Sequence, residues 1–291
     1  MKIVYKHKNF RSAAKETIAQ ANEIIQEYQD QGFSLTLRQL YYQFVARDLL
    51  GNNQKNYNNL GAVINHARLA GLIDWEAIVD RTRNLKTNLH WDDPADIILQ
   101  CARQFAINKW QDQDYHVEVW IEKEALIGVI EPVCQRWDVP FFACKGYTSQ
   151  SEQWRAGRRF KKAISRGQNV IIFHLGDHDP SGIDMTRDNQ ERTQMFAEGE
   201  GVEVRRLALN MDQVEDQGPP PNPAKQTDSR FETYRMKYGD ESWELDALEP
   251  VFIDRLIGEA IGDILDQEAW DKSVELENEH KATLMEIAKN L

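Results

Sequence analysis

Apolar residues recur at helical spacing along the first quarter of the chain. Within residues 10–28 they lie three or four positions apart, which is typical of an amphipathic helix. The stretch Thr36-Leu37-Arg38-Gln39 has the form of a capping box and predicts a second helix to about Leu50, and a third is expected from about 57 to 69. Three short helices followed by the segment 71–83 are typical of a helix-turn-helix or winged-helix module.

The pattern changes after a predicted helical connector. Short apolar runs that predict strands alternate with longer amphipathic stretches, which indicates a parallel α/β sheet with crossover helices. The expected strands are 116–121, 139–144, 169–175 and 202–209, and the expected helices are 124–137, 151–167 and 180–199. A proline-broken loop is expected over 216–245, followed by an acidic helical C-terminal region from about Asp246.

These elements predict four parts of the chain. Residues 1–90 form the winged-helix domain, 91–112 the connector, 113–215 the parallel α/β domain and 216–291 the loop with its helical extension.

No apolar run approaches the roughly 20 residues that cross a bilayer, and the N-terminal stretch lacks the apolar core of a signal peptide. We therefore expect a cytoplasmic protein without a membrane partner. Cys101, Cys134 and Cys144 are far apart and are expected to be buried apolar residues.

Charge is distributed unevenly. The chain has a formal net charge of −12, yet residues 1–90 hold 12 Lys and Arg against 8 Asp and Glu, while the remaining 201 residues hold 23 against 39. A mildly basic N-terminal part is compatible with a local DNA-binding surface. A second basic surface is expected on the helix 151–167, from Arg155, Arg158, Arg159, Lys161, Lys162 and Arg166, although a solvated helix face would have the same composition.

Carboxylates follow two of the predicted strands. Glu122 ends the first strand, and Asp177 and Asp179 follow the third within Gly176-Asp177-His178-Asp179-Pro180. Asp179 before Pro180 is explained as a helix N-cap. Asp177 is not explained in this way, because two neighbouring carboxylates repel each other unless a cation lies close to them. In parallel sheets the carboxyl ends of the strands meet at one edge, so the three are expected to converge there and hold Mg²⁺, with Mn²⁺ as a substitute.

His174 and His178 near these acids raise the alternative of a transition metal. A second alternative is that the acids are only helix caps and solvated side chains.

Two tyrosines stand side by side on the second predicted helix. Leu40, Tyr41 and Phe44 share its core face, whereas Tyr42 points elsewhere, one turn after Arg38. Tyr42 is either a surface aromatic or a nucleophile. A phenol has a pKa of about 10, so a nearby cation such as Arg38 would be needed to favour the reactive phenolate.

The ordered trio of "TLRQLYYQF", "VWIEKEAL" and "LGDHDPSGIDM" resembles the A subunit of type IIB topoisomerases (topoisomerase VI) and its meiotic double-strand-break relatives, with the compact Mini-A proteins most similar. The resemblance covers roughly residues 10–215. It implies a winged-helix domain with Tyr42 as the nucleophile and Arg38 as its partner, followed by a Toprim domain in which Glu122, Asp177 and Asp179 hold Mg²⁺. The position after Arg38, often acidic in that family, is Gln39 here.

The resemblance further implies cleavage of double-stranded DNA through a covalent five-prime phosphotyrosyl intermediate. It also implies a homodimer, a nucleoid-associated location and a possible separate GHKL-type ATPase subunit, since the chain itself has no phosphate-binding Gly-x-x-x-x-Gly-Lys loop. Two other functions fit the same residues. One is a Toprim nuclease that uses activated water, and the other is a non-enzymatic DNA-binding module.

Overall fold

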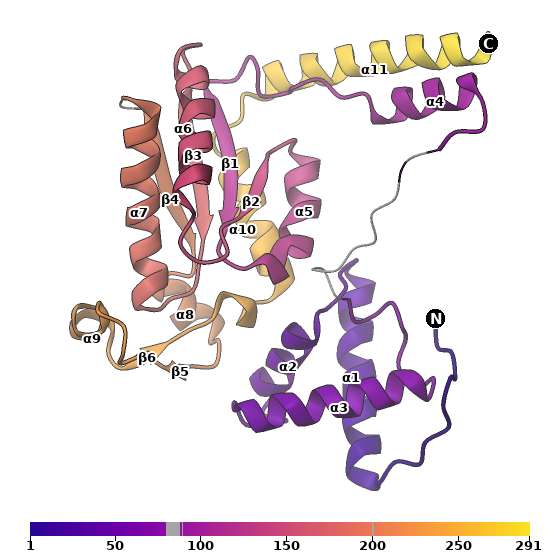
Figure 1. Ribbon diagram of the computed structural model, residues 1–291, viewed down its shortest axis with the longest axis vertical. Coiled ribbons are helices and arrows are strands. Elements are labelled where there is room, and N and C mark those ends of the chain that lie inside the picture. Colours follow the sequence, from indigo (N-terminus) through magenta and orange to yellow (C-terminus); the bar gives the residue numbers. More distant parts are fainter. Residues whose placement is uncertain (80–87, 89, 200) are drawn as a thin grey trace.

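A computed structural model gives the fold, and it describes residues 1–79, 88, 90–199 and 201–291. The N-terminal part is a bundle of three helices whose apolar faces meet in one core (Figure 1). Thr36 and Gln39 form the expected reciprocal capping box at the start of the second helix. The helices are α1 (Ser12–Asp30), α2 (Leu37–Ala46) and α3 (Gln54–Leu69). Residues 80–83, at the end of the segment 71–83, lie outside the described residues.

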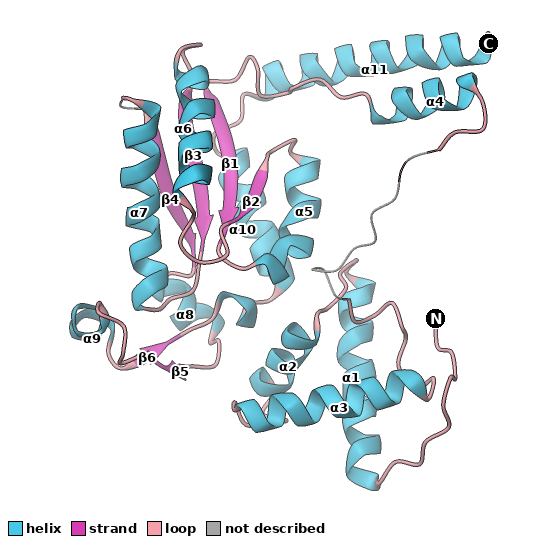
Figure 2. Cartoon of the chain, in the orientation of Figure 1, coloured by secondary structure: helices cyan, strands magenta, loops and turns pink. Residues whose placement is uncertain are grey.

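A four-stranded parallel sheet follows in the second part of the chain, as the alternation of strands and helices predicts (Figure 2). Its strand order is β2-β1-β3-β4. The strands are β1 (Tyr115–Ile121), β2 (Phe141–Ala143), β3 (Asn169–Leu175) and β4 (Val202–Ala208). The intervening helices are η1 (Glu124–Leu126), α5 (Ile127–Arg136), α6 (Gln150–Ile164) and α7 (Pro180–Ala197).

The sheet is covered on both faces because successive side chains of a strand point to opposite sides. In β3, Ile171 and Phe173 belong to the core beneath α5 and the C-terminal helices, while Val170 and Ile172 belong to the core beneath α6. Burial on both faces explains why β3 reads as a continuous apolar run.

The segment 216–245 was expected to be a loop, but it contains a short helix and a pair of short strands. Phe231 and Tyr234 bury their rings and form a helical turn packed near α7, and a short antiparallel pair of strands flanks it. The elements after β4 are α8 (Met211–Gln217), β5 (Asn222–Pro223), α9 (Phe231–Tyr238), β6 (Glu241–Ser242), η2 (Leu245–Ala247), α10 (Pro250–Gly262) and α11 (Gln267–Lys289).

The connector is only partly helical. Helix α4 (Pro94–Gln104) lies alongside α11, and a non-helical segment with a turn at 109–112 leads from it to β1 (Figure 1). Cys101 on α4 is exposed, contrary to expectation, whereas Cys134 and Cys144 are buried as expected. In the described part of the chain, no helix combines the length and the apolar character needed to cross a bilayer. The division at residues 90, 112 and 215 stays a prediction.

Candidate active site at the carboxyl edge of the sheet

The ends of β1 and β3 bring Glu122 and Asp177 together. These strands are paired in parallel with Ile121 opposite Leu175, so the residues that follow them emerge at the same edge. The Asp177 N–H donates to Glu122 Oε2 at 2.9 Å. Gly176 permits this approach, since a Cβ there would lie 3.0 Å from the same oxygen.

Asp179 performs the capping role that its position before proline suggests. Its Oδ1 accepts from the Gly182 N–H at 2.6 Å at the start of α7. Gly182 is required because a Cβ at this position would lie 2.2 Å from the Asp177 carbonyl oxygen. Arg206 of β4 donates to that same carbonyl at 2.6 Å and to the Gly176 carbonyl at 3.0 Å. These contacts therefore fix the backbone conformation of the loop 176–179.

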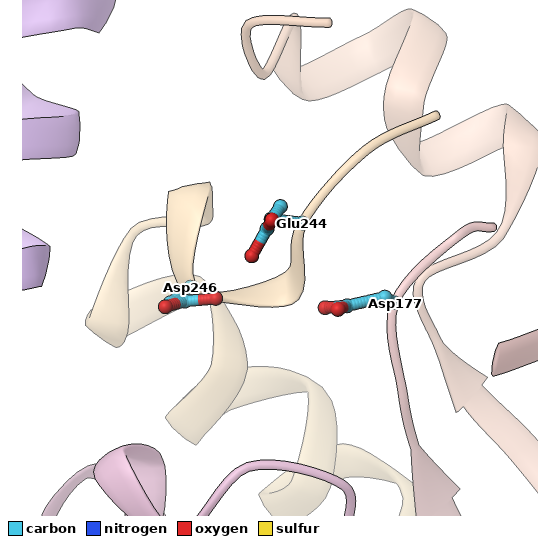
Figure 3. Close-up of side chains that lie close together, drawn as sticks. All are labelled: Asp177, Glu244 and Asp246. Carbon is cyan, nitrogen blue, oxygen red and sulfur yellow. The ribbon is translucent and has the colours of Figure 1, made fainter. Parts of the chain in front are cut away.

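The closest group of carboxylates includes two residues that the sequence argument missed. Oxygen atoms of Asp177, Glu244 and Asp246 all lie within 4.8 Å of one another (Figure 3). Glu244 and Asp246 come from the segment between β6 and α10, and the Leu245 N–H donates to Asp177 Oδ1 at 2.7 Å. A signal was present, because Glu244-x-Asp246 repeats the spacing of Asp177-x-Asp179. Glu122 and Asp179 flank this group without belonging to it.

Two cations offset part of the negative charge of this group. Lys123 Nζ lies 2.8 Å from Asp177 Oδ2, 2.6 Å from Asp246 Oδ1 and in contact with Glu244. Arg38 reaches the group from α2, with its Nε 2.7 Å from Asp246 Oδ2 and its guanidinium in contact with Glu244. Burial alone would lower the pKa of Lys123, but the surrounding carboxylates outweigh burial and raise it, so this side chain remains charged.

Burial is the largest influence on the pKa of Asp177 and on that of Glu122. It raises the pKa of Asp177, and the charges of neighbouring acids add to the rise although Lys123 opposes it. Burial likewise raises the pKa of Glu122, with a further contribution from Asp179. Carboxylate oxygens in this number suit a hard divalent cation such as Mg²⁺, because binding a cation would relieve their mutual repulsion. Asp177, Glu244 and Asp246 thus offer oxygen ligands of the type that Mg²⁺ prefers, while the ligand set Glu122, Asp177 and Asp179 stays a prediction.

Tyr42 is buried, with 5% of its surface exposed, yet it lies outside the core that holds Tyr41. It faces a surface pocket that Arg38 and Glu244 also line. The Arg38 guanidinium carbon lies 5.7 Å from the centre of the Tyr42 ring. Burial and the Glu244 charge raise the pKa of Tyr42 to about 12, while Arg38 and Lys123 act in the opposite direction.

The two histidines near the acids are engaged elsewhere. His174 is fully buried, and its Nδ1 lies 2.9 Å from Thr186 Oγ1. His178 Nδ1 lies 2.7 Å from the Tyr234 hydroxyl. Neither belongs to the close carboxylate group of the described residues, so the geometry gives the transition-metal alternative no support.

Some basic side chains of helix α6 form ion pairs within the protein, and others are exposed to solvent. Arg159 makes two 3.0 Å hydrogen bonds to the buried Glu118 carboxylate, so its charge is committed to the fold. Arg155 pairs with Glu152 on the same helix, and Arg158 and Lys161 both approach Glu198. Lys162 and Arg166 are exposed and form no ion pair within the described ranges. A phosphate-binding role of this helix stays a prediction.

No protein-family model matches the chain, and no curated protein matches its sequence at a significant level. The site is therefore interpreted from its own geometry, together with the motif resemblance described above.

Proposed function

We propose that the protein cleaves double-stranded DNA by tyrosine transesterification, in the manner of the topoisomerase VI A subunit. One observation carries the proposal. Helix α2 packs against η2, and there Arg38 lies between Tyr42 and the carboxylates Glu244 and Asp246. A candidate nucleophile, a cation and a set of metal-binding oxygens thus meet, although they come from distant parts of the sequence.

The proposed chemistry follows from the side chains. The Tyr42 oxygen attacks a backbone phosphorus and loses its proton, a bond forms to the five-prime phosphate, and the bond to the three-prime oxygen breaks. The three-prime oxygen leaves as a hydroxyl after taking up a proton. Arg38 favours the phenolate and contacts the phosphate, because its charge lies beside the ring.

Glu122, Asp177 and Asp179 are the proposed ligands of Mg²⁺ from the motif resemblance. Glu244 and Asp246, which form a close group with Asp177, could supply further oxygen ligands. When bound, the metal supplies positive charge that neutralises the phosphodiester. The finer fold assignments, a winged helix for α1–α3 and a Toprim domain for the parallel sheet, belong to the same proposal, as do the homodimer and a separate GHKL-type ATPase subunit. The motif resemblance supports these last two.

The test uses supercoiled plasmid DNA with Mg²⁺ or Mn²⁺, stopped with detergent and analysed with and without protease. The wild type is compared with Tyr42→Phe and with Tyr41→Phe, a matched loss of one hydroxyl from the neighbouring ring. We expect protein-linked nicked or linear DNA from the wild type and Tyr41→Phe, and none from Tyr42→Phe.

A second candidate is metal-dependent hydrolysis by water. The observation in its favour is that burial and Glu244 raise the pKa of Tyr42 to about 12, which makes the phenolate less accessible than in a free tyrosine. This candidate predicts that Tyr42→Phe still cuts the plasmid and leaves protein-free ends. Binding without cleavage under every divalent ion would support a DNA-binding module instead.

A further inference from the structure

A pocket of about 290 Å³ opens beside Tyr42, at the end of the candidate active site. It lies between the turn that joins α2 to α3 and the strand β5, and its volume is at the lower limit for small-molecule sites. The residues that give the pocket its chemistry are Arg38, Tyr42, Asn52, Gln54, Tyr57 and Asn222.

Aromatic rings form a continuous series along this pocket. The Tyr41 ring lies 5.7 Å from that of Tyr42 and 5.3 Å from that of Tyr57, between centroids. The Tyr41 hydroxyl accepts from the Asn53 N–H at 2.7 Å, which fixes the turn, and Asn53 caps α3. Tyr41 and Asn53 are therefore explained by the fold.

Other groups on the pocket are not needed for the helices. Asn52 is exposed and caps no helix, and its Nδ2 donates to Asn222 Oδ1 at 2.6 Å across the pocket. Within the described residues the hydroxyl of Tyr57 makes no hydrogen bond, and its side chain is half-buried. The pocket thus offers amide groups, aromatic surface and one guanidinium, which is paired with the Glu244 carboxylate at the pocket wall.

We infer that this pocket binds one unstacked nucleotide of the DNA strand that Tyr42 attacks, so that its lining selects the base next to the cleavage position. Unstacked bases bind to proteins by stacking on aromatic rings and by hydrogen bonds from their edges to amides. Asn52 and Asn222 supply such amides, and Arg38 supplies the charge for the adjoining phosphate. The inference rests on the proposed function in one respect, that the ligand is DNA.

The test is photo-cross-linking without metal, so that cleavage does not contribute. A set of duplexes carries 5-iododeoxyuridine at successive positions of one strand, and each is irradiated with the full-length protein. This base cross-links to aromatic side chains on which it stacks. We expect one position to cross-link to the peptide that contains Tyr42 and Tyr57, as mapped by mass spectrometry.

Variants separate stacking from folding. Tyr57→Phe keeps the ring and should keep the cross-link, whereas Tyr57→Leu should lose it and bind the duplex about 5- to 100-fold more weakly. Asn52→Ala, at an exposed position, should change the ratio of affinities for duplexes that differ only at the cross-linking base, by about 10-fold.

The outcomes distinguish this inference from the proposed function. Cross-linking at the pocket without plasmid cleavage retains the pocket and overturns the cleavage reaction. Two outcomes would overturn the pocket alone while cleavage still depends on Tyr42. The first is cross-linking only outside the pocket, and the second is an equal cross-linking yield from Tyr57→Phe and Tyr57→Leu. Absence of any bound duplex overturns both.

Discussion

Replacing Lys123 by methionine tests whether its ammonium holds the acid group together. At an effective dielectric constant of about 20, a unit charge pair near 2.7 Å contributes about 6 kcal/mol. Lys123 makes such contacts with Asp177 and Asp246 while only 19% of its side chain is exposed. Desolvation of the buried ions cancels much of this energy, and removal of one partner from a buried pair typically costs about 3–5 kcal/mol. We expect Lys123→Met to lose that amount near neutral pH.

Urea unfolding followed by circular dichroism measures the loss. Lys145→Met is the matched control, because Lys145 is 61% exposed and forms a surface ion pair with Glu124, so its loss should stay below about 1 kcal/mol. The deficit of Lys123→Met should shrink as the pH falls. Without the ammonium, the folded carboxylates bind protons more readily than the unfolded ones, so folding becomes less favourable as the pH rises.

Divalent cations provide a second readout on the same variant. Mg²⁺ should stabilise Lys123→Met by about 2.7 kcal/mol at a concentration one hundredfold above its Kd for this variant, because it binds only the folded acid group. The wild type should gain less, because Lys123 competes with the metal for the same oxygens. Equal losses in Lys123→Met and Lys145→Met, with no response to Mg²⁺, would refute the assignment of Lys123 as the neutralising charge.

Three further predictions concern the surroundings of the site. Gly182→Ala should destabilise the fold by about 3 kcal/mol in urea unfolding, because its Cβ would lie 2.2 Å from a backbone oxygen, whereas Gly262→Ala, with open space, should stabilise it slightly. Tyr28→Phe removes the hydroxyl that contacts Glu249 between α1 and the start of α10, and should cost about 1–2 kcal/mol. Burial lowers the pKa of His174 to about 3 in the folded protein. The unfolded chain, with a histidine pKa of about 6.5, binds a proton on this side chain at higher pH than the folded protein does, so the free energy of unfolding falls as the pH drops below about 6.5. His174→Asn should remove roughly 2 kcal/mol of that loss at about pH 5.

The sequence was informative where a local pattern determines the structure. The apolar run 169–175 forms β3 because both of its faces are buried, and the capping box at Thr36 forms because it needs only neighbouring residues. The meeting of Glu122 with Asp177 was also predictable, since parallel strands end at the same edge of a sheet. These inferences require no knowledge of distant contacts.

The remainder of the site depends on packing between distant segments. Arg38 and Glu244 are 206 residues apart, and no periodicity connects them. The prolines at 219–221 and 223 favoured a loop over the whole of 216–245, which concealed α9 and the segment that carries Glu244. Tyr42 was correctly placed off the core face of its helix, but its burial follows from the docking of α2 against that segment.

Arg38 contacts both the carboxylates and the ring of Tyr42. Its side chain is 45% exposed, and its guanidinium contacts Glu244 and Asp246 while it lies beside Tyr42. A partly buried ion network of this kind contributes little net stability compared with apolar packing, so stability alone does not account for it. A DNA phosphate at the pocket competes with Glu244 for the same guanidinium, since bidentate binding suits both anions. Glu244→Gln should therefore strengthen phosphate binding and also lower the pKa of Tyr42, because it removes a negative charge that raises that pKa. A cleavage profile that shifts to lower pH in Glu244→Gln would support this account, and a shift to higher pH would contradict it.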